Sequence, residues 1–292
     1  MQEINARCPA KVNLHLEVLF RREDGYHEIE TIFQAIGLYD RIEFRRTKGP
    51  IHVSCKHPSV PEDRTNLCHR AAKLLRNRTG CDLGVDIHIE KTIPVTAGLG
   101  GGSSNAAATL VALRRLWDLD LDDDRLHELA AMLGADVPFF LAGGTQLGRG
   151  IGDRLSPLPG LEGGHFLVLS PPVEVSAAWA YGQLRMGLTR ESAKITLQHV
   201  KPVLSRFPER QWPGFNRLGD VVFPAHPSVH RLYLDLLDTG PAVAMLSGSG
   251  PSVYAVYRSE GEAVRARDSL DLAGASSWIG GAVRHGVQLR EN

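Results

Sequence analysis

The sequence has little charge imbalance. Its 33 Lys and Arg residues balance 33 Asp and Glu residues, so the formal net charge is zero. No global positive field is available to recruit nucleic acid or an anionic membrane, and we expect neither as a partner. Any site that binds an anion must therefore be local.

Long apolar runs and paired cysteines are also missing. No run approaches the roughly 20 residues that a membrane span needs, and no signal peptide opens the chain, so a cytoplasmic protein is expected. Cys8, Cys55, Cys68 and Cys81 show neither CxxC spacing nor an accompanying histidine pair, which argues against a zinc site and a disulfide framework. With 292 residues, 43% of them hydrophobic, the chain can bury a sizeable core in one large or two ordinary domains.

The most informative segment present is PVTAGLGGGSSN, residues 94–105. Before it, Val85, Ile87 and Ile89 alternate with polar residues and predict a strand; after it, apolar residues recur at helical spacing. The glycines between allow close approach to the backbone, and the free N–H groups at the start of the helix favour phosphate. The segment lacks the lysine of a Walker loop and the third glycine of a dinucleotide fingerprint, so a plain strand-to-helix turn remains the alternative.

Residues 4–20 are expected to form a strand with Lys11 and Asn13 on its polar side. The pair Asp24-Gly25 predicts a turn into a second strand, and hence a hairpin. Lys11 alone is compatible with a solvated edge strand or with a cleft.

A further candidate residue, Asp136, follows two predicted helices. One is expected to start near Asn66 and end at Gly80, and another to end at Gly134. Asp136 follows in the apolar segment GADVPFF. Because burying an unpaired carboxylate costs several kcal/mol, Asp136 is expected to have a cationic or donor partner, in either a structural salt bridge or a catalytic pair.

Three segments together resemble, in order and spacing, the signature motifs of the GHMP small-molecule kinases. They are CPAKVNLHL (8–16), PVTAGLGGGSSN (94–105) and MLSGSGPSVYAVY (245–257). Further segments resemble the members that act on a substrate carrying a cytidine diphosphate group, in isoprenoid precursor biosynthesis by the non-mevalonate pathway. These are DGYHEIETIFQAIGLYD (24–40), LGADVPFFLAGG (133–144) and GRGIGDRLSPL (148–158).

The mixture of strands and helices without regular βαβ alternation favours the α+β class. The resemblance adds a two-domain GHMP kinase fold, with an N-terminal domain like ribosomal protein S5 domain 2 and a ferredoxin-like C-terminal domain. We expect an ATP-binding and catalytic domain at 1–152 and a domain with substrate contacts at 153–292. A monomer or weak homodimer is expected.

The resemblance also implies the chemistry: ATP, with Mg²⁺, phosphorylates a hydroxyl of the substrate. Lys11 and Asp136 form the catalytic pair, in which Asp136 receives the hydroxyl proton. Asn13, Tyr26, His27 and Tyr181 are the implied substrate residues, with the tyrosines stacking on the cytosine and His27 hydrogen-bonding to it. Phe33 lines the same pocket or belongs to the core. The implied ATP-binding residues are Asn66, Lys91, Pro94, Val95, Thr96, Ala97, Gly98, Leu99, Gly100, Gly101, Gly102, Ser103 and Ser104.

Two further expectations follow from the resemblance. A hydroxyl of Ser104, or else of Ser103, is the implied Mg²⁺ ligand. The glycine-serine turn at 247–250 is expected to support the phosphate-binding segment. The alternative is a plain β-turn.

The chain departs from the family pattern at FNRLGDVVF, where Arg217 and Gly219 replace two acids, and at Ala177, where some members have a substrate-contacting threonine. One alternative function is another GHMP kinase, acting on homoserine, mevalonate or a sugar. The implied cytosine residues argue against it, because those substrates carry no base to stack. The other alternative is a GHMP-fold protein that senses a ligand without turnover, and the retained catalytic pair argues against that.

Overall fold

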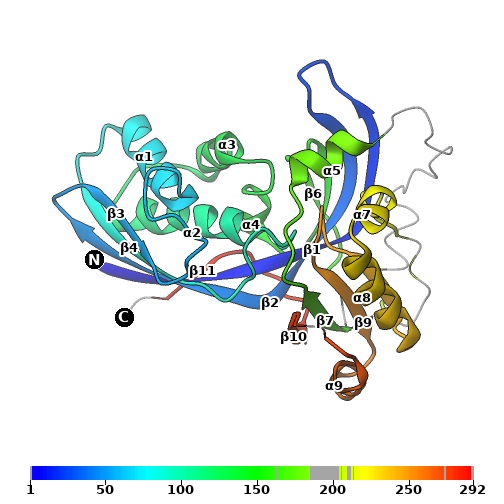
Figure 1. Cartoon of the computed structure of the whole chain (residues 1–292). Coiled ribbons are helices and arrows are strands. Elements are labelled where there is room, and N and C mark those ends of the chain that lie inside the picture. Colours follow the sequence, from blue (N-terminus) through cyan, green and yellow to red (C-terminus); the bar gives the residue numbers. More distant parts are fainter. Residues whose placement is uncertain are drawn as a thin grey trace.

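The chain folds into two sheets with helices packed on them (Figure 1). A computed structural model describes residues 2–290, except 162, 185–203, 205, 209–211, 213 and 273. The larger sheet has seven strands in the order β11-β1-β2-β4-β3, with β5 paired to β2 and β6 to β5. The smaller has four antiparallel strands in the order β10-β7-β9-β8. The predicted α+β class is confirmed.

The bounds of the elements are as follows. The strands are β1 (Glu3–Arg21), β2 (His27–Thr47), β3 (Ile51–Cys55), β4 (Gly84–Glu90), β5 (Thr145–Gly150), β6 (Arg154–Pro157), β7 (His165–Ser170), β8 (Val243–Leu246), β9 (Val253–Tyr257), β10 (Ser276–Gly281) and β11 (Gln288–Arg290). The helices are α1 (Leu67–Thr79), α2 (Gly101–Leu116), α3 (Asp123–Leu133), α4 (Phe139–Ala142), α5 (Ala177–Gln183), α7 (Gly219–Ala225), α8 (Pro227–Asp238) and α9 (Glu260–Ser269).

Strands β1 and β2 form a long antiparallel hairpin that runs through the molecule and projects beyond it (Figure 1). Its turn contains Asp24 and Gly25, as predicted, and Gly25 has a φ of 87°. Near the turn, β2 pairs with β5, and farther along it pairs with β4. One strand thus joins two parts of the larger sheet.

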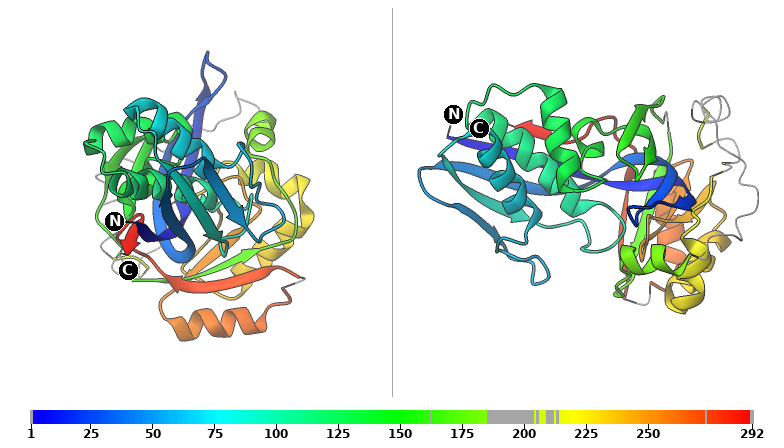
Figure 2. Two further views of the ribbon diagram at one scale, coloured as in Figure 1. Left: turned by 90° about the vertical axis from the view of Figure 1, so that its left-hand side faces the viewer. Right: turned by 90° about the horizontal axis from the view of Figure 1, so that it is seen from above.

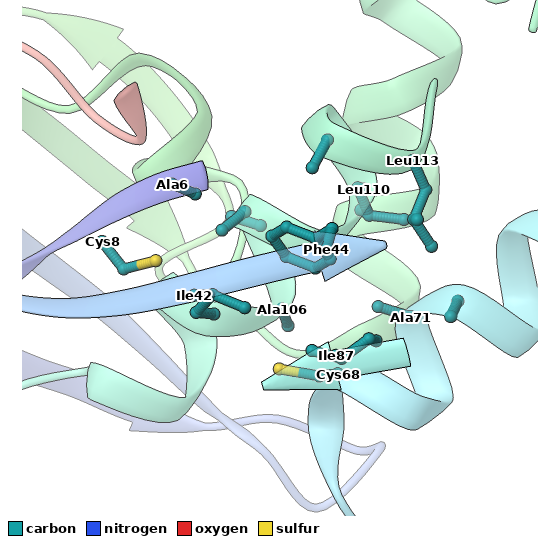
Figure 3. Close-up of a cluster of buried hydrophobic side chains, with 14 of the residues drawn as sticks. Ala6, Cys8, Ile42, Phe44, Cys68, Ala71, Ile87, Ala106, Leu110 and Leu113 are labelled. Carbon is teal, nitrogen blue, oxygen red and sulfur yellow. The ribbon is translucent and has the colours of Figure 1, made fainter. Parts of the chain in front are cut away.

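The larger core lies between this sheet and helices α1 and α2. Figure 3 shows Phe44 and Ile42 of β2 facing Ala106 and Leu110 of α2, and all four side chains are buried. The small residues at the start of α2 let the helix lie close to the sheet. The glycine-rich segment 94–105 is therefore attached to a rigid base.

The smaller sheet uses both of its faces. Phe166 and Val168 of β7 share a buried cluster with the β1–β2 hairpin, whereas the alternate residues Leu167 and Leu169 share one with α8 and α9. This is the period of two that a strand buried on both faces requires. The hairpin belongs to the larger sheet, and its side chains share buried clusters with both faces of the smaller sheet.

The larger sheet continues beyond residue 152. Strand β6 pairs with β5, and β11, close to the C-terminus, returns to pair with β1. The two termini consequently lie near each other (Figure 2). Among the described residues, no helix is both long and apolar enough to cross a membrane.

Candidate active site

The segment between β4 and α2 forms a tight loop over the hairpin. Gly98 and Gly100 have φ values of 74° and 70°, in the left-handed region that favours glycine. A Cβ on Gly98 would lie 2.0 Å from the carbonyl oxygen of Ser247, and one on Gly100 would lie 3.0 Å from Cγ of Lys11. Both positions require glycine for their conformation and for their close contacts. The free N–H groups of the first turn of α2 begin directly after them.

The glycine-serine turn supports this loop, as expected. The hydroxyl of Ser247 donates to the carbonyl oxygen of Gly98 at 3.0 Å. The turn is held in its own place by Asn216, whose Nδ2 donates to the carbonyl oxygen of Gly248 at 2.7 Å. The segment around Asn216 carried little signal in the sequence, so this support was missed.

The predicted partner of Asp136 is Lys11. Nζ of Lys11 lies 3.7 Å from Oδ2 of Asp136 and donates to Oδ1 of Asn13 at 2.8 Å. Nδ2 of Asn13 in turn donates to Oγ1 of Thr31 at 2.7 Å. The side chain of Lys11 is 5% exposed and that of Asp136 35%, so a fixed ammonium stands behind an accessible carboxylate. Nζ of Lys11 also lies 5.6 Å from the ring centroid of Phe33. Phe33 belongs both to the core and to the lining of the cleft.

Two cavities meet at the glycine loop. The loop cavity, of about 320 Å³, lies between residues 91–105 and the start of α1. The cleft, of about 1370 Å³, contains Lys11 and Asp136 and extends to the hairpin turn and α5. Thr96, Gly98, Gly100 and Ser103 line both. A group bound in one cavity can therefore reach the other across these residues.

Most residues predicted to bind ATP line the loop cavity; the two exceptions are Leu99 and Ser104. Both are buried, and the Ser104 hydroxyl has no hydrogen-bond partner. Ser104, the residue named first as a metal ligand, lines neither cavity. Ser103, which lines both cavities, is the better placed of the two serines.

Two residues of the loop cavity already have partners. Asn66 is the N-cap of α1: its Oδ1 accepts from the N–H of Cys68 at 2.8 Å, and its Nδ2 donates to the carbonyl oxygen of Pro61 at 2.6 Å. The ammonium of Lys91 donates to Oδ2 of the buried Asp40 at 2.5 Å. Asn66 is thus the helix-start residue that its position in the sequence predicted.

The implied cytidine residues all line the cleft. The rings of His27 and Tyr181 stack with centroids 5.3 Å apart, whereas Tyr26 is 61% exposed at the hairpin turn. Burial and the nearby charge of Arg21 lower the pKa of His27, so its ring is neutral at pH 7. Burial and the charge of Asp136 raise the pKa of Tyr181, which keeps its phenol protonated. In this structure the ring of Tyr181 stacks on His27, while Tyr26 stays exposed at the hairpin turn.

Sequence reasoning missed two charged residues of the cleft, Arg21 and Glu174. Neither belongs to a recognisable motif, and only the fold brings them to the same cavity. The arginine that departs from the family pattern in FNRLG, Arg217, has its partner on β1. Arg217 donates two hydrogen bonds, each of 2.8 Å, to the carboxylate of the buried Glu17, so the position that lost an acid now pairs with one.

The chain matches known proteins along its whole length. The GHMP kinase N-terminal domain matches residues 66–144, and the GHMP kinase C-terminal domain matches residues 209–275. A 4-diphosphocytidyl-2-C-methyl-D-erythritol kinase of Geobacter sulfurreducens is 40% identical over 97% of this chain and 99% of its own. One from Gloeobacter violaceus is 43% identical over 90% of this chain and 88% of its own.

Solved structures agree with these matches. A crystal structure of 4-(cytidine 5'-diphospho)-2C-methyl-D-erythritol kinase superposes with a TM-score of 0.81 at 35% identity, covering 95% of this chain and 98% of its own. A homoserine kinase from Cytophaga hutchinsonii has a TM-score of 0.77 at 18% identity, covering 99% and 98%, and shares the fold. The chain therefore belongs to the GHMP kinases and, within them, to the family of the 4-diphosphocytidyl-2-C-methyl-D-erythritol kinases.

Proposed function

We propose that this protein uses ATP to phosphorylate the 2-hydroxyl of 4-diphosphocytidyl-2-C-methyl-D-erythritol. The observation that carries the proposal is the meeting of two cavities at the glycine loop, beside the Lys11–Asp136 pair. The loop cavity, at about 320 Å³, falls within the range of small-molecule pockets, roughly 300–1,000 Å³, and the cleft, at about 1370 Å³, leaves room for a larger acceptor. Phosphoryl transfer needs mainly such positioning of two substrates and neutralisation of charge.

In the proposed reaction, the acceptor hydroxyl lies beside Asp136. Its oxygen attacks the γ-phosphorus of ATP while the bond from that phosphorus to the β,γ-bridging oxygen breaks. Asp136 accepts the hydroxyl proton late in the step, because a carboxylate is too weak a base to remove it beforehand. Lys11 stabilises the charge that develops, and Asn13 holds its ammonium in place.

The phosphates of ATP are proposed to lie against the glycine loop and the first turn of α2, where N–H groups and the helix dipole favour anions. Among the described residues, no three His, Cys, Asp or Glu side chains group as a metal site. This fits Mg²⁺, which keeps several waters and takes few protein ligands beside substrate phosphates. Ser103 is the oxygen donor that would hold it, and the ion would neutralise phosphate charge.

An assay of ADP release, with and without 4-diphosphocytidyl-2-C-methyl-D-erythritol, tests the function. We expect ADP to form only when this acceptor is present, and homoserine and mevalonate to be inactive in parallel reactions. Preferred turnover of either control would favour another GHMP kinase. Tight acceptor binding without ADP release would favour a ligand sensor.

A further inference from the structure

Asp40 is a fully buried carboxylate of β2 that accepts four hydrogen bonds. Oδ2 accepts from Nζ of Lys91 at 2.5 Å and from Nδ2 of Asn105 at 3.0 Å. Oδ1 accepts from the backbone N–H groups of Thr92 and Ile93, each at 2.8 Å. An ionised carboxylate offers about four acceptor positions, so the group is saturated.

The four donors lie at the two ends of the phosphate-binding segment, residues 94–105. Lys91, Thr92 and Ile93 come directly before the segment, and Asn105 is its last residue. A single carboxylate therefore joins the two ends of the segment to β2. Because β2 pairs with both β1 and β4 at this level, the anchor itself cannot shift without disturbing the sheet.

Lys91 extends this anchor to the start of α2. Its ammonium also donates to the carbonyl oxygen of Ile93 at 2.9 Å, and a Cβ on Gly101 would lie 2.8 Å from it. A buried cation near a helix N-terminus is unfavourable by itself, and Asp40 offsets its charge. With its side chain 6% exposed and two bonds already made, Lys91 is better placed to hold the loop than to reach phosphate.

We propose that Asp40 is a positioning residue for phosphoryl transfer. Through Lys91, Asn105 and the backbone of 92–93, it holds the glycine loop in the conformation that binds ATP. The inference rests on the proposed function of the loop as the ATP site. It predicts an effect on ATP that acceptor binding in the cleft does not share.

The double substitution Asp40→Asn/Lys91→Met tests the proposal. It removes both charges at nearly constant volume, a change that buried ion pairs often tolerate in stability. We expect a folded protein with ATP affinity, measured by calorimetry, weakened by roughly tenfold or more, the equivalent of about 1.4 kcal/mol. Affinity for the acceptor should stay within about twofold of the parent's, since most residues that line the cleft, among them His27 and Tyr181, lie outside the glycine loop.

A matched control is Glu17→Gln/Arg217→Met, which neutralises another ion pair with a buried carboxylate, and neither of its residues lines the loop cavity. It should leave ATP affinity unchanged. If the Asp40 double variant does not fold, Asn105→Ala removes one tether alone and should still weaken ATP selectively. Unchanged ATP affinity in a folded variant, or equal loss of ATP and acceptor binding, would overturn the proposal.

A second measurement separates this inference from the proposed function. ATP titration of the parent involves no acceptor. A parent protein that binds ATP but does not phosphorylate 4-diphosphocytidyl-2-C-methyl-D-erythritol would reject the proposed acceptor and leave the Asp40 test intact. If Asp40 acts through Lys91, then Lys91→Met should add little to the effect of Asp40→Asn, because coupled residues give non-additive changes.

Discussion

At the scale of single residues, the proposed catalytic pair, Lys11 and Asp136, combines one fixed group and one accessible group. Lys11 is buried, and its ammonium contacts Asn13 more closely than Asp136. Asp136 sits in the turn between α3 and α4, with its side chain partly open to the cleft. This arrangement gives the cation a structural anchor and leaves carboxylate oxygens for a substrate hydroxyl.

Asp136→Asn should lower kcat by roughly 10²-fold or more, the usual scale of positioned acid–base catalysis. The amide keeps the size of the side chain but cannot accept the proton as a carboxylate does. KM for the acceptor should change little, because the shape of the cleft is preserved. Steady-state kinetics at saturating ATP measure both constants, and a near-normal kcat would make Asp136 a structural residue.

Gly102 offers a clean test of the loop cavity. A Cβ there would meet only Cδ1 of Leu67, at 3.3 Å, and both residues line that cavity. Gly102→Ala should therefore weaken ATP binding by roughly tenfold, about 1.4 kcal/mol, through the added methyl group. Thermal stability should hold or rise slightly, since alanine suits a helix better than glycine. Gly101 is less suitable, because a Cβ there would press on Lys91 and Ile93.

Calorimetric titration with ATP and a melting curve would be run on the same Gly102→Ala sample. A stable variant with parental ATP affinity would show that ATP does not occupy the loop cavity.

At the scale of elements, α5 and the hairpin together close one end of the cleft. Tyr181 comes from α5 and His27 from the start of β2, and their stacked rings join two segments that are far apart in the chain. An acceptor base that inserts here has to separate or extend this stack. Its affinity should therefore depend on the ring of Tyr181 rather than on its hydroxyl.

Tyr181→Ala should weaken the acceptor by roughly 5- to 150-fold, taking about 1 to 3 kcal/mol for stacking of one base on an aromatic ring. Tyr181→Phe is the matched control and should bind nearly as well as the parent. Inhibition by CMP measures binding at the base site without the rest of the acceptor. UMP should inhibit the parent much less, because the groups that hydrogen-bond to cytosine would be left unpaired by uracil. Equal inhibition by CMP and UMP would contradict a cytosine site.

Strand β1 contacts residues 214–218 through two buried side chains, Glu17, which pairs with Arg217, and His15. His15 is 2% exposed, and its ring meets that of Phe215 edge-on at 4.8 Å. Burial lowers the pKa of His15 to about 4, from an ordinary value of 6.5. The folded protein therefore holds this imidazole neutral, whereas the unfolded chain protonates it near pH 6.5.

His15 should make the protein less stable in mild acid. Its contribution is fully present above pH 6.5 and is lost as the pH falls toward 4, to a total of about 3 kcal/mol. Urea unfolding at pH 7 and pH 5, for the parent and for His15→Gln, isolates this group from the other titrating residues. The parent should lose more stability than the variant, and equal losses would show that His15 does not titrate as proposed.

At the scale of the whole molecule, the sequence predicted the elements better than their long-range contacts. The alternation from Val85 to Ile89 and the cap at Asn66 are local signals, and each produced the expected element. Local pattern and motif together predicted that Lys11 and Asp136 pair, and their charged groups lie 3.7 Å apart.

Long-range polar contacts were not predictable in the same way. Asp40 meets Lys91, and Glu17 meets Arg217, across 51 and 200 residues of chain. The packing of the sheets determines which residue each carboxylate meets. A charged residue on a strand shows the same local sequence pattern whether it is solvated or paired. The return of β11 to the edge of β1 was missed for a similar reason, because three residues carry too little periodicity to identify a partner strand.

The β1–β2 hairpin gives the protein a way to select acceptors by length. Lys11 lies near the middle of β1, while Tyr26 and His27 stand at the turn, so one continuous ribbon carries the groups proposed for the two ends of the acceptor. A compact alcohol can contact either group but not both at once. An acceptor whose reactive hydroxyl and base are separated by a diphosphate linker can engage both, and its far end then orients its near end.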